Sequence, residues 1–345
     1  MTGDANRPGR PPTIYDVAKA AGVAASTVSR AYARPGRVNA ATAERIRRVA
    51  AELGYRVTPP ASAAPDGRTS MLALVVSDVT NPFYAEIIRG AESAAAQAGY
   101  VLLLIDAQES DRLERSSLKR ALPGVEGVVL AGTRLPDSAI RMAATQRPVV
   151  VLNRDVADVP SIVLDDPCGM RLAAEHLAGL GHRALVYVAG PEASWADGMR
   201  WRSLREAAAG LGRRVQRIGP FPPTIGGGRA AAVALRADRP TAVVTYNDQL
   251  AIGLLLGLQA DGVRIPEDTS VIGFDDIFPA RIVTPGLTTV AAPLRVQGRT
   301  AVSAVLSHRG APAARTGGPM TLPVRLVRRA STARPPRRAP DAPRR

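Results

Sequence analysis

Polar and aromatic side chains follow a series of short apolar runs in the middle of this chain, and their types suit the binding of a small polar molecule. Guanidinium and carboxylate groups can form paired hydrogen bonds with neighbouring hydroxyls, and an aromatic face can stack on a sugar ring or a base. The candidates are Asp78, Phe83, Tyr84, Asn153, Trp195, Arg200, Tyr246, Asn247 and Asp275. We predict that these side chains converge on one cleft.

The sequence offers little that would catalyse a reaction or hold a metal. The paired carboxylates Asp165-Asp166 and Asp275-Asp276 are neighbours in the chain, and such doublets rarely face one another. None of the three histidines stands beside a candidate nucleophile or at a metal-binding spacing. Residues 226–228 are three glycines without the lysine of a phosphate-binding loop, and we interpret them as a flexible turn. We therefore expect no catalytic residue, no metal and no cofactor.

Strands must carry the candidate side chains to a common edge. A first series of apolar runs lies at residues 72–76, 101–105, 127–130 and 149–152. A second series lies at residues 184–188, 242–245 and 270–273. Helical patterns lie between them, the first one capped by Asn81 with Pro82 at its first position. This alternation predicts an α/β body of two parallel-sheet subdomains over residues 71–328. Ligands in such folds bind beyond the carboxyl ends of the strands, where the candidates lie.

Residues 13–58 have the pattern of an all-α helix-turn-helix domain. Thr13 can cap a first helix, Gly22 can adopt the left-handed conformation of a tight turn, and Asn39 can cap a third helix. The outward residues of the second helix are Ala25, Ser26, Ser29 and Arg30. A short polar helix presented in this way is typical of domains that read double-stranded DNA.

The charge of the chain is concentrated at its two ends. The formal net charge is +15 over 345 residues, of which residues 1–60 carry +6 and residues 325–345 carry +7. A basic head suits a surface that contacts phosphates. The tail, residues 329–345, is rich in arginine and proline without an apolar pattern, and we expect it to be disordered.

The head resembles the DNA-binding headpiece of the lactose-repressor (LacI) family of bacterial transcription regulators. The resemblance rests on the run Thr27-Val28-Ser29-Arg30 and on the closing Glu52-Leu53-Gly54-Tyr55. It implies that Ala25 and Ser26 occupy the positions that specify the DNA sequence, and that Arg30 contacts a base or a phosphate. Phosphate contacts are expected from Thr13, Ser29, Asn39 and Tyr55, and Thr27 completes the predicted DNA surface.

The body is similar to the effector domain of the same family, which itself resembles periplasmic sugar-binding proteins. The similarity includes residues 77–83, 247–253 and 273–276. By position it implies effector contacts from Asn153, Arg200, Asn247 and Asp275, with Phe83 or Tyr84 as an aromatic wall. A sugar or sugar derivative is the favoured effector. A nucleoside or nucleobase is the alternative, because the aromatic side chains of the cleft could stack on a base.

Together these features predict a DNA-binding transcriptional regulator, most simply a repressor. One head of about 50 residues buries too little surface for tight specific binding, so we expect a homodimer on a pseudo-palindromic operator. A sugar-binding transport protein shares the body fold, but the DNA-binding head argues against it. The first residues lack an apolar signal segment and no apolar run reaches membrane-spanning length, so we expect a cytoplasmic protein without a membrane partner.

The linker, residues 59–70, departs from the family pattern. Relatives form a short hinge helix here and insert a leucine into the minor groove of the DNA. This chain has Ala64 at that position, followed by Pro65. Alanine is too short to separate base pairs and proline opposes a continuing helix, so we expect weaker bending of the operator.

Overall fold

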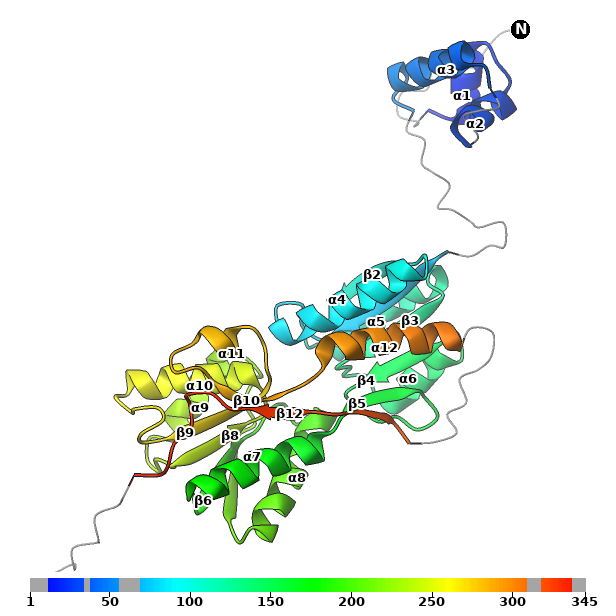
Figure 1. Ribbon diagram of the computed structural model, residues 1–345. Coiled ribbons are helices and arrows are strands. Elements are labelled where there is room, and N and C mark those ends of the chain that lie inside the picture. The colour runs from blue at the N-terminus through cyan, green and yellow to red at the C-terminus, as the bar shows by residue number, and fades with distance from the viewer. Residues whose placement is uncertain (1–11, 34–37, 56–68, 309–317, 337–345) are drawn as a thin grey trace, which may run out of the picture. The chain divides into compact units, whose positions relative to one another are not determined.

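The computed structural model describes residues 12–33, 38–55, 69–308 and 318–336. The chain divides into two compact units, Met1–Gly67 and Arg68–Arg345 (Figure 1). Most of the predicted linker, with Ala64 and Pro65, lies outside the described residues. Among the residues that are described, no helix combines the length and the apolar character needed to cross a bilayer.

Three helices form the first unit: α1 (Ile14–Ala21), α2 (Ala25–Ala33) and α3 (Ala40–Glu52). Apolar residues at helical spacing turn one face of each helix toward a shared core, in which Val17, Val28 and Ile46 are fully buried. Gly22 ends α1 with a left-handed φ of 62°. The Asn39 side chain accepts a hydrogen bond of 2.9 Å from a backbone amide in the first turn of α3. The predicted turn and the predicted cap of α3 are thus confirmed.

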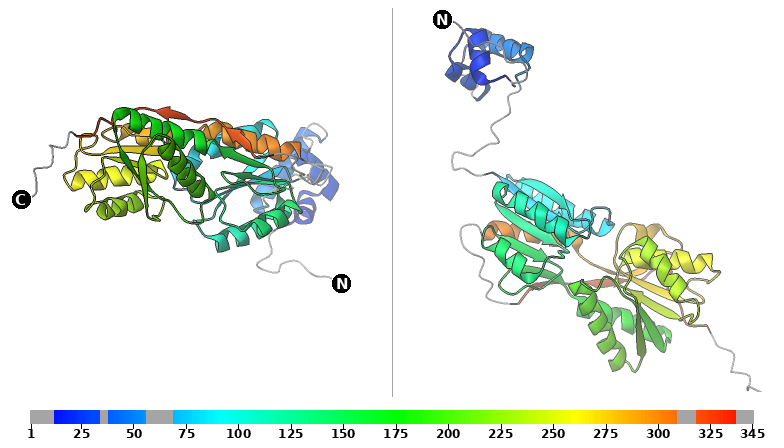
Figure 2. Two further views of the ribbon diagram at one scale, coloured as in Figure 1. Left: turned by 90° about the horizontal axis from the view of Figure 1, so that it is seen from below. Right: turned by 180° about the vertical axis from the view of Figure 1, so that it is seen from behind.

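The second unit contains two six-stranded sheets, one in each of two subdomains (Figure 2). The first sheet has the order β11-β5-β4-β3-β1-β2 and is parallel throughout. Its strands are β1 (Met71–Val76), β2 (Val101–Asp106), β3 (Gly127–Ala131), β4 (Val149–Leu152), β5 (Ser161–Leu164) and β11 (Met320–Leu322).

The second sheet has the order β12-β10-β9-β8-β6-β7, and only β12 runs antiparallel to its neighbour. Its strands are β6 (Ala184–Val188), β7 (Arg214–Ile218), β8 (Ala242–Thr245), β9 (Ser270–Asp275), β10 (Thr288–Ala291) and β12 (Arg325–Val327). The chain crosses between the subdomains after β5, after β10 and between β11 and β12. Each subdomain is therefore assembled from distant segments of the sequence.

Helices pack on both sheets. The first subdomain carries α4 (Pro82–Gln97), α5 (Asp111–Ala121), the 3-10 helix η2 (Leu122–Gly124), α6 (Asp137–Ala144) and α12 (Leu294–Ser307). The second carries α7 (Asp166–Leu180), α8 (Trp195–Gly210), α9 (Ile225–Ala234), α10 (Asp248–Ala260) and α11 (Pro279–Ile282). Helix α12 returns to the first subdomain and lies beside α4, although some 200 residues separate the two in the chain (Figure 1).

Glycines allow two helix pairs to approach closely. Gly228 in α9 faces Gly253 in α10, and a Cβ added at either position would collide with the backbone of the other helix. In the same way, a Cβ added at Gly90 in α4 would collide with the backbone of α12, and one added at Gly298 in α12 would collide with the backbone of α4. The interpretation of residues 226–228 as a flexible turn is therefore wrong. They lie inside α9, and Gly228 is the one among them whose missing side chain allows the backbone of α10 to come into contact.

The expectation that residues 329–345 are disordered is wrong for residues 329–336, which we name the C-terminal strap; residues 337–345 lie outside the described residues. Ser331 of the strap is fully buried, and its carbonyl accepts a hydrogen bond of 2.8 Å from the Val271 amide. The Ser331 hydroxyl accepts another from the Thr288 amide at 2.8 Å. The Ala333 carbonyl lies 3.0 Å from Nε2 of the buried His182. Backbone pairing with the body thus fixes this polar segment, which has no apolar pattern of its own.

Truncation after Arg328 should destabilise the body, whereas truncation after Pro336 should not. The shorter chain would leave His182, the Ser270 hydroxyl and the Thr288 amide without their partners in the strap. Each unsatisfied buried group costs about 1–3 kcal/mol, so the free energy of unfolding should fall by roughly 3 kcal/mol or more. Urea unfolding followed by circular dichroism measures this difference. Equal midpoints for the two truncated chains would show that the strap contributes nothing.

Candidate functional site

In the first unit, the outward face of α2 carries side chains predicted to contact DNA. Ser26, Ser29 and Arg30 are exposed, whereas Val28 on the other side of the helix is buried. The Arg30 guanidinium donates to both the carbonyl and the hydroxyl oxygen of Ser26, each at 3.2 Å. Because residues four apart share one helix face, Ser26 and Arg30 present a single polar surface.

The other predicted DNA contacts lie at the helix starts and ends. Asn39 caps α3 and is exposed, whereas four of these residues are partly buried: Thr13, Ala25, Thr27 and Tyr55. The Asp16 carboxylate accepts hydrogen bonds from both the amide and the hydroxyl of Thr13, at 2.7 and 2.6 Å. Tyr15 is 73 % exposed on α1 and is not among the residues predicted from the sequence.

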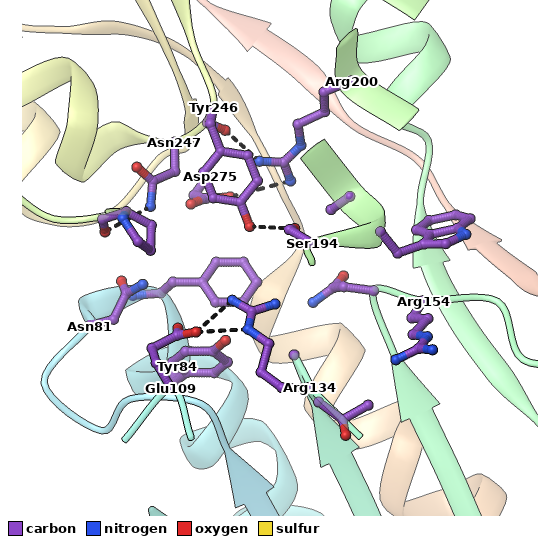
Figure 3. A pocket seen from close by; sticks show the side chains of 17 residues that line it. Asn81, Tyr84, Glu109, Arg134, Arg154, Ser194, Arg200, Tyr246, Asn247 and Asp275 are labelled. Atoms are coloured by element: carbon purple, nitrogen blue, oxygen red, sulfur yellow. Dashed lines mark hydrogen bonds and ion pairs between the residues drawn. The ribbon is translucent and has the colours of Figure 1, made fainter. Parts of the chain in front are cut away.

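In the second unit, a cavity opens between the two subdomains at the carboxyl ends of their strands (Figure 3). Eight of the nine residues predicted for the cleft line it: Phe83, Tyr84, Asn153, Trp195, Arg200, Tyr246, Asn247 and Asp275. The first subdomain supplies the three that follow β1 and β4, and the second supplies the rest. Strand ends far apart in the sequence therefore meet at one place, as parallel sheets require.

Asp78 is the predicted cleft residue that the structure does not place in this cavity. Its carboxylate accepts hydrogen bonds from the Thr80 amide at 2.9 Å and from the Thr80 hydroxyl at 2.7 Å. This local pairing closes the turn between β1 and α4. Asp78 lines a neighbouring opening that shares Asn81, Glu109, Arg134 and Pro223 with the cavity.

Several lining residues were not among those predicted for the cleft: Glu109, Thr133, Arg134, Arg154 and Ser194, together with Asn81, the predicted cap of α4. Glu109 follows β2 and Arg134 follows β3, so they obey the same strand-end rule as the predicted residues. The backbone of Gln108 and Glu109 is left-handed, with φ of 50° and 54°, which the sequence does not signal. That turn directs the Glu109 carboxylate to Arg134, with 2.8 Å between Oε2 and Nε (Figure 3).

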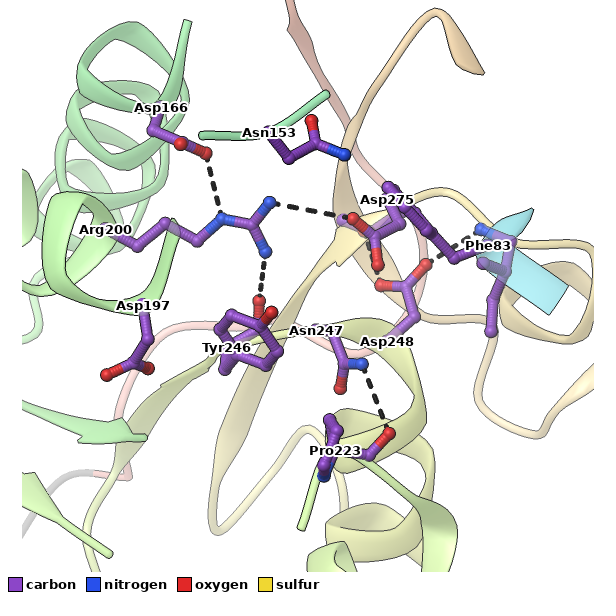
Figure 4. A network of polar contacts seen from close by, with 12 residues as sticks. Phe83, Asn153, Asp166, Asp197, Arg200, Pro223, Tyr246, Asn247, Asp248 and Asp275 are labelled. Carbon is purple, nitrogen blue, oxygen red and sulfur yellow. Dashed lines mark hydrogen bonds and ion pairs between the residues drawn. The ribbon is translucent and has the colours of Figure 1, made fainter. Parts of the chain in front are cut away.

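Arg200 is the centre of a buried polar network on the second-subdomain side of the cavity (Figure 4). Only 4 % of its side chain is exposed, and Nε donates to Asp166 at 2.9 Å. One terminal nitrogen donates to the Tyr246 carbonyl at 2.6 Å, and the other lies 3.8 Å from Oδ1 of Asp275. The guanidinium also stacks over the Phe274 ring, 3.5 Å from its centroid. All three guanidinium nitrogens are thereby fixed in direction.

Two buried polar atoms at the cavity wall have no hydrogen-bond partner: Oδ1 of Asp275 and Nδ2 of Asn153. The other amide atom of Asn153 accepts from Gln297 at 2.8 Å, which holds the amide in place. Both residues have a left-handed backbone, with φ of 115° for Asp275 and 59° for Asn153. Such conformations cost about 1–3 kcal/mol each outside glycine and concentrate at binding sites. Two residues of the cavity wall thus each hold a buried polar atom, one acceptor and one donor, to which the described residues give no hydrogen bond.

Burial perturbs the carboxylates around this network. It raises the pKa of Asp275 well above the usual range, against the opposing charge of Arg200. It also raises the pKa of Asp248 to about 7. Asp248 does not line the cavity; its oxygens accept from the Thr289 hydroxyl at 2.6 Å and the Ile277 amide at 2.9 Å. Asp248 therefore holds the β9–α11 segment in place.

Asn247 serves two purposes in the structure. Its side chain caps α10 by accepting from the Leu250 amide at 2.9 Å, and its Nδ2 donates weakly to the Pro223 carbonyl at 3.4 Å. Within the described residues, no group of three or more histidine, cysteine, aspartate or glutamate side chains is placed to hold a metal ion. The arrangement of donors, acceptors and aromatic rings suits the binding of a polar, uncharged ring.

Two family models match the chain. Residues 13–57 match the bacterial regulatory proteins of the lacI family, and residues 174–332 match a periplasmic binding protein-like domain. The transcriptional regulator DegA of Bacillus subtilis is 33% identical over 336 residues, which cover 93% of this chain and 98% of DegA. The transcriptional repressor CytR of Escherichia coli is 32% identical, over 86% of this chain and 89% of CytR. These relatives are regulators, in agreement with the expectation that the chain is not an enzyme.

Solved structures give the same result. The lac repressor dimer bound to operator and an anti-inducer is 27% identical, with a TM-score of 0.73 over 94% of this chain and 100% of that one. A LacI-family regulator of Enterococcus faecalis with bound ribose is 30% identical, with a TM-score of 0.70 over 76% of this chain and 99% of that one. The predicted fold, a helix-turn-helix head with a periplasmic-binding-protein-like body, is confirmed. The chain belongs to the LacI family of bacterial regulatory proteins.

Proposed function

We propose that this protein is a cytoplasmic transcriptional repressor that binds a pseudo-palindromic operator as a homodimer and responds to a sugar or sugar derivative in the cavity of its body. The observation that carries the effector assignment is the pair of unsatisfied atoms on Asp275 and Asn153. A hydroxyl donates one hydrogen bond and accepts others, so it can satisfy a carboxylate oxygen and an amide nitrogen together. The ribose-bound relative supports this assignment.

A nucleoside is the second candidate, because its ribose could bind the polar lining residues while its base stacks on the aromatic ones. The rings of Tyr84 and Tyr246 lie among the lining side chains, and the hydroxyl of Tyr246 is 3.1 Å from that of Ser194. Aromatic side chains of this kind stack on bases as readily as on sugar rings. A binding panel of monosaccharides, disaccharides, nucleosides and nucleobases separates the two candidates.

The exposed apolar residues of the body support the proposed dimer. Val101, at the start of the edge strand β2, is 64 % exposed, and Phe278 and Ile282 around α11 are 69 % and 64 % exposed. A sheet edge with outward apolar residues is usually covered by a partner. A symmetric pair of heads would then read two half-sites about one helical turn of DNA apart, or a multiple of it.

Selection of full-length protein on a random DNA pool, followed by sequencing, tests the DNA-binding part of the proposal. We expect inverted repeats to be recovered, because two identical heads read the same half-site in opposite orientation. Sedimentation of the complex should give two chains per duplex. Recovery of no common sequence, or of single half-sites bound by one chain, would contradict the proposal.

A further inference from the structure

We propose that the cavity selects an uncharged effector and rejects phosphorylated ones, and that Glu109 is the residue that determines this selection. The inference rests on the proposed function, because it concerns the ligand of the same cavity. Its basis is the charge pairing of the lining side chains, which is independent of the resemblance to other regulators.

Every arginine that lines the cavity already has a carboxylate partner among the described residues. Arg200 is paired with Asp166 and Asp275. Arg154 lies 2.5 Å from the Asp137 carboxylate and donates a second hydrogen bond to a backbone carbonyl at 2.7 Å. An arginine holds a phosphate group through charge-assisted, often paired hydrogen bonds from its guanidinium. The lining therefore offers an anion no unpaired cation.

Arg134 lines both the cavity and the neighbouring opening, so a phosphate that enters there meets this arginine, and Glu109 already occupies its guanidinium. The two side chains meet inside the cavity, with 2.6 Å and 2.8 Å from two guanidinium nitrogens to the same Glu109 oxygen (Figure 3). Glu109 is fixed by its left-handed backbone and by a hydrogen bond of 2.6 Å from its amide to the Ser77 carbonyl. The carboxylate is thus held against Arg134 by the fold of the loop.

The neighbouring opening adds a second barrier to anions. Its charged lining residues are Asp78, Glu109, Asp111 and Arg134, three carboxylates against one guanidinium. An approaching phosphate would meet a field of its own sign, whereas a neutral sugar would not. Inside, a hydroxyl can accept from Arg134 or donate to Glu109 without separating the pair, but a phosphate must displace the carboxylate.

The test uses full-length protein and inorganic phosphate as the probe, with melting temperatures compared with sodium chloride at equal ionic strength. We expect no phosphate-specific stabilisation of the wild type. Glu109→Gln keeps the size of the side chain and removes its charge, so phosphate should now bind and raise the melting temperature of this variant above its value in sodium chloride. The gain should disappear in the double variant with Arg134→Gln. Glu175→Gln, which breaks an exposed ion pair with Arg171 away from the cavity, is the matched control and should behave as the wild type.

Two results would overturn the proposal. One is stabilisation of the wild type by phosphate that Arg134→Gln abolishes, since the cavity would then be an anion site. The other is a Glu109→Gln variant that folds with the wild-type spectrum and gains nothing from phosphate. Neither result bears on DNA selection. A protein that showed the expected phosphate pattern but recovered no inverted repeat would overturn the regulator assignment alone.

Discussion

Replacing Arg200 with alanine should lower the free energy of unfolding of the body by about 3–5 kcal/mol and abolish effector binding. The guanidinium is the cation that faces two buried carboxylates, Asp166 at 2.9 Å and Asp275 at 3.8 Å. Without it both would be left in a nearly dry environment, where an uncompensated charge is costly. Burial already raises the pKa of Asp166 despite Arg200, and the variant removes the positive charge that opposes this rise.

Urea unfolding and calorimetric binding of the panel compounds measure these two effects separately. Adding Asp166→Asn and Asp275→Asn to Arg200→Met should recover stability, because it replaces an ionic network with neutral groups, but it should not recover binding. Arg171→Ala, at an exposed position on α7, is the control and should change the midpoint little. An Arg200→Ala protein of wild-type stability would show that the network is not the structural centre of this subdomain.

Replacing Arg30 with alanine should weaken binding to the selected operator by about 1–3 kcal/mol and relax the sequence preference at one position of each half-site. Arg30 is exposed on α2 beside Ser26, and within the described residues its guanidinium donates hydrogen bonds to Ser26 alone. A side chain free to leave a weak intrahelical contact can make two hydrogen bonds to one guanine edge. In a dimer both half-sites would lose this contact.

Repeating the random-pool selection with the variant shows whether the preference changes. Arg48→Ala on α3 removes the same charge from a different helix, where the side chain is 72 % exposed and lies 3.9 Å from Glu52. It should recover the wild-type sequence with slightly lower affinity at low salt. If the Arg30→Ala variant selected the wild-type sequence and bound it with the wild-type affinity, α2 would not be the helix that reads the bases.

The periodic features of the fold could be predicted because they depend on local rules. Helical spacing of apolar residues, a left-handed glycine and a capping asparagine define the head, and Gly22 and Asn39 behave as expected. Apolar runs that end in polar residues define the sheets, which is why eight predicted residues line the cavity. This rule does not account for loop conformation, and it therefore fails for Asp78, which lies just beyond β1 but pairs with Thr80 in its own turn.

What could not be predicted depends on contacts between distant segments. Glu109 reaches the cavity because Gln108 and Glu109 both adopt a left-handed backbone conformation, although neither is a glycine. Residues 226–228 have the composition of a turn but lie in a helix, where Gly228 packs against α10. The C-terminal strap has the composition of a disordered tail, and its order comes from buried partners such as His182, about 150 residues earlier. Tertiary pairing overrides composition in these cases.

A ligand in the cavity should set the affinity of this protein for DNA. The most direct measurement is fluorescence anisotropy of a labelled selected operator, titrated with full-length protein with and without a saturating compound from the binding panel. We expect the dissociation constant to change by about 5–150-fold, the range of typical coupling free energies, and the change to be lost in Asn153→Ala. Equal affinities at full occupancy of the cavity would contradict the account, because the bound ligand would then leave DNA binding unaltered.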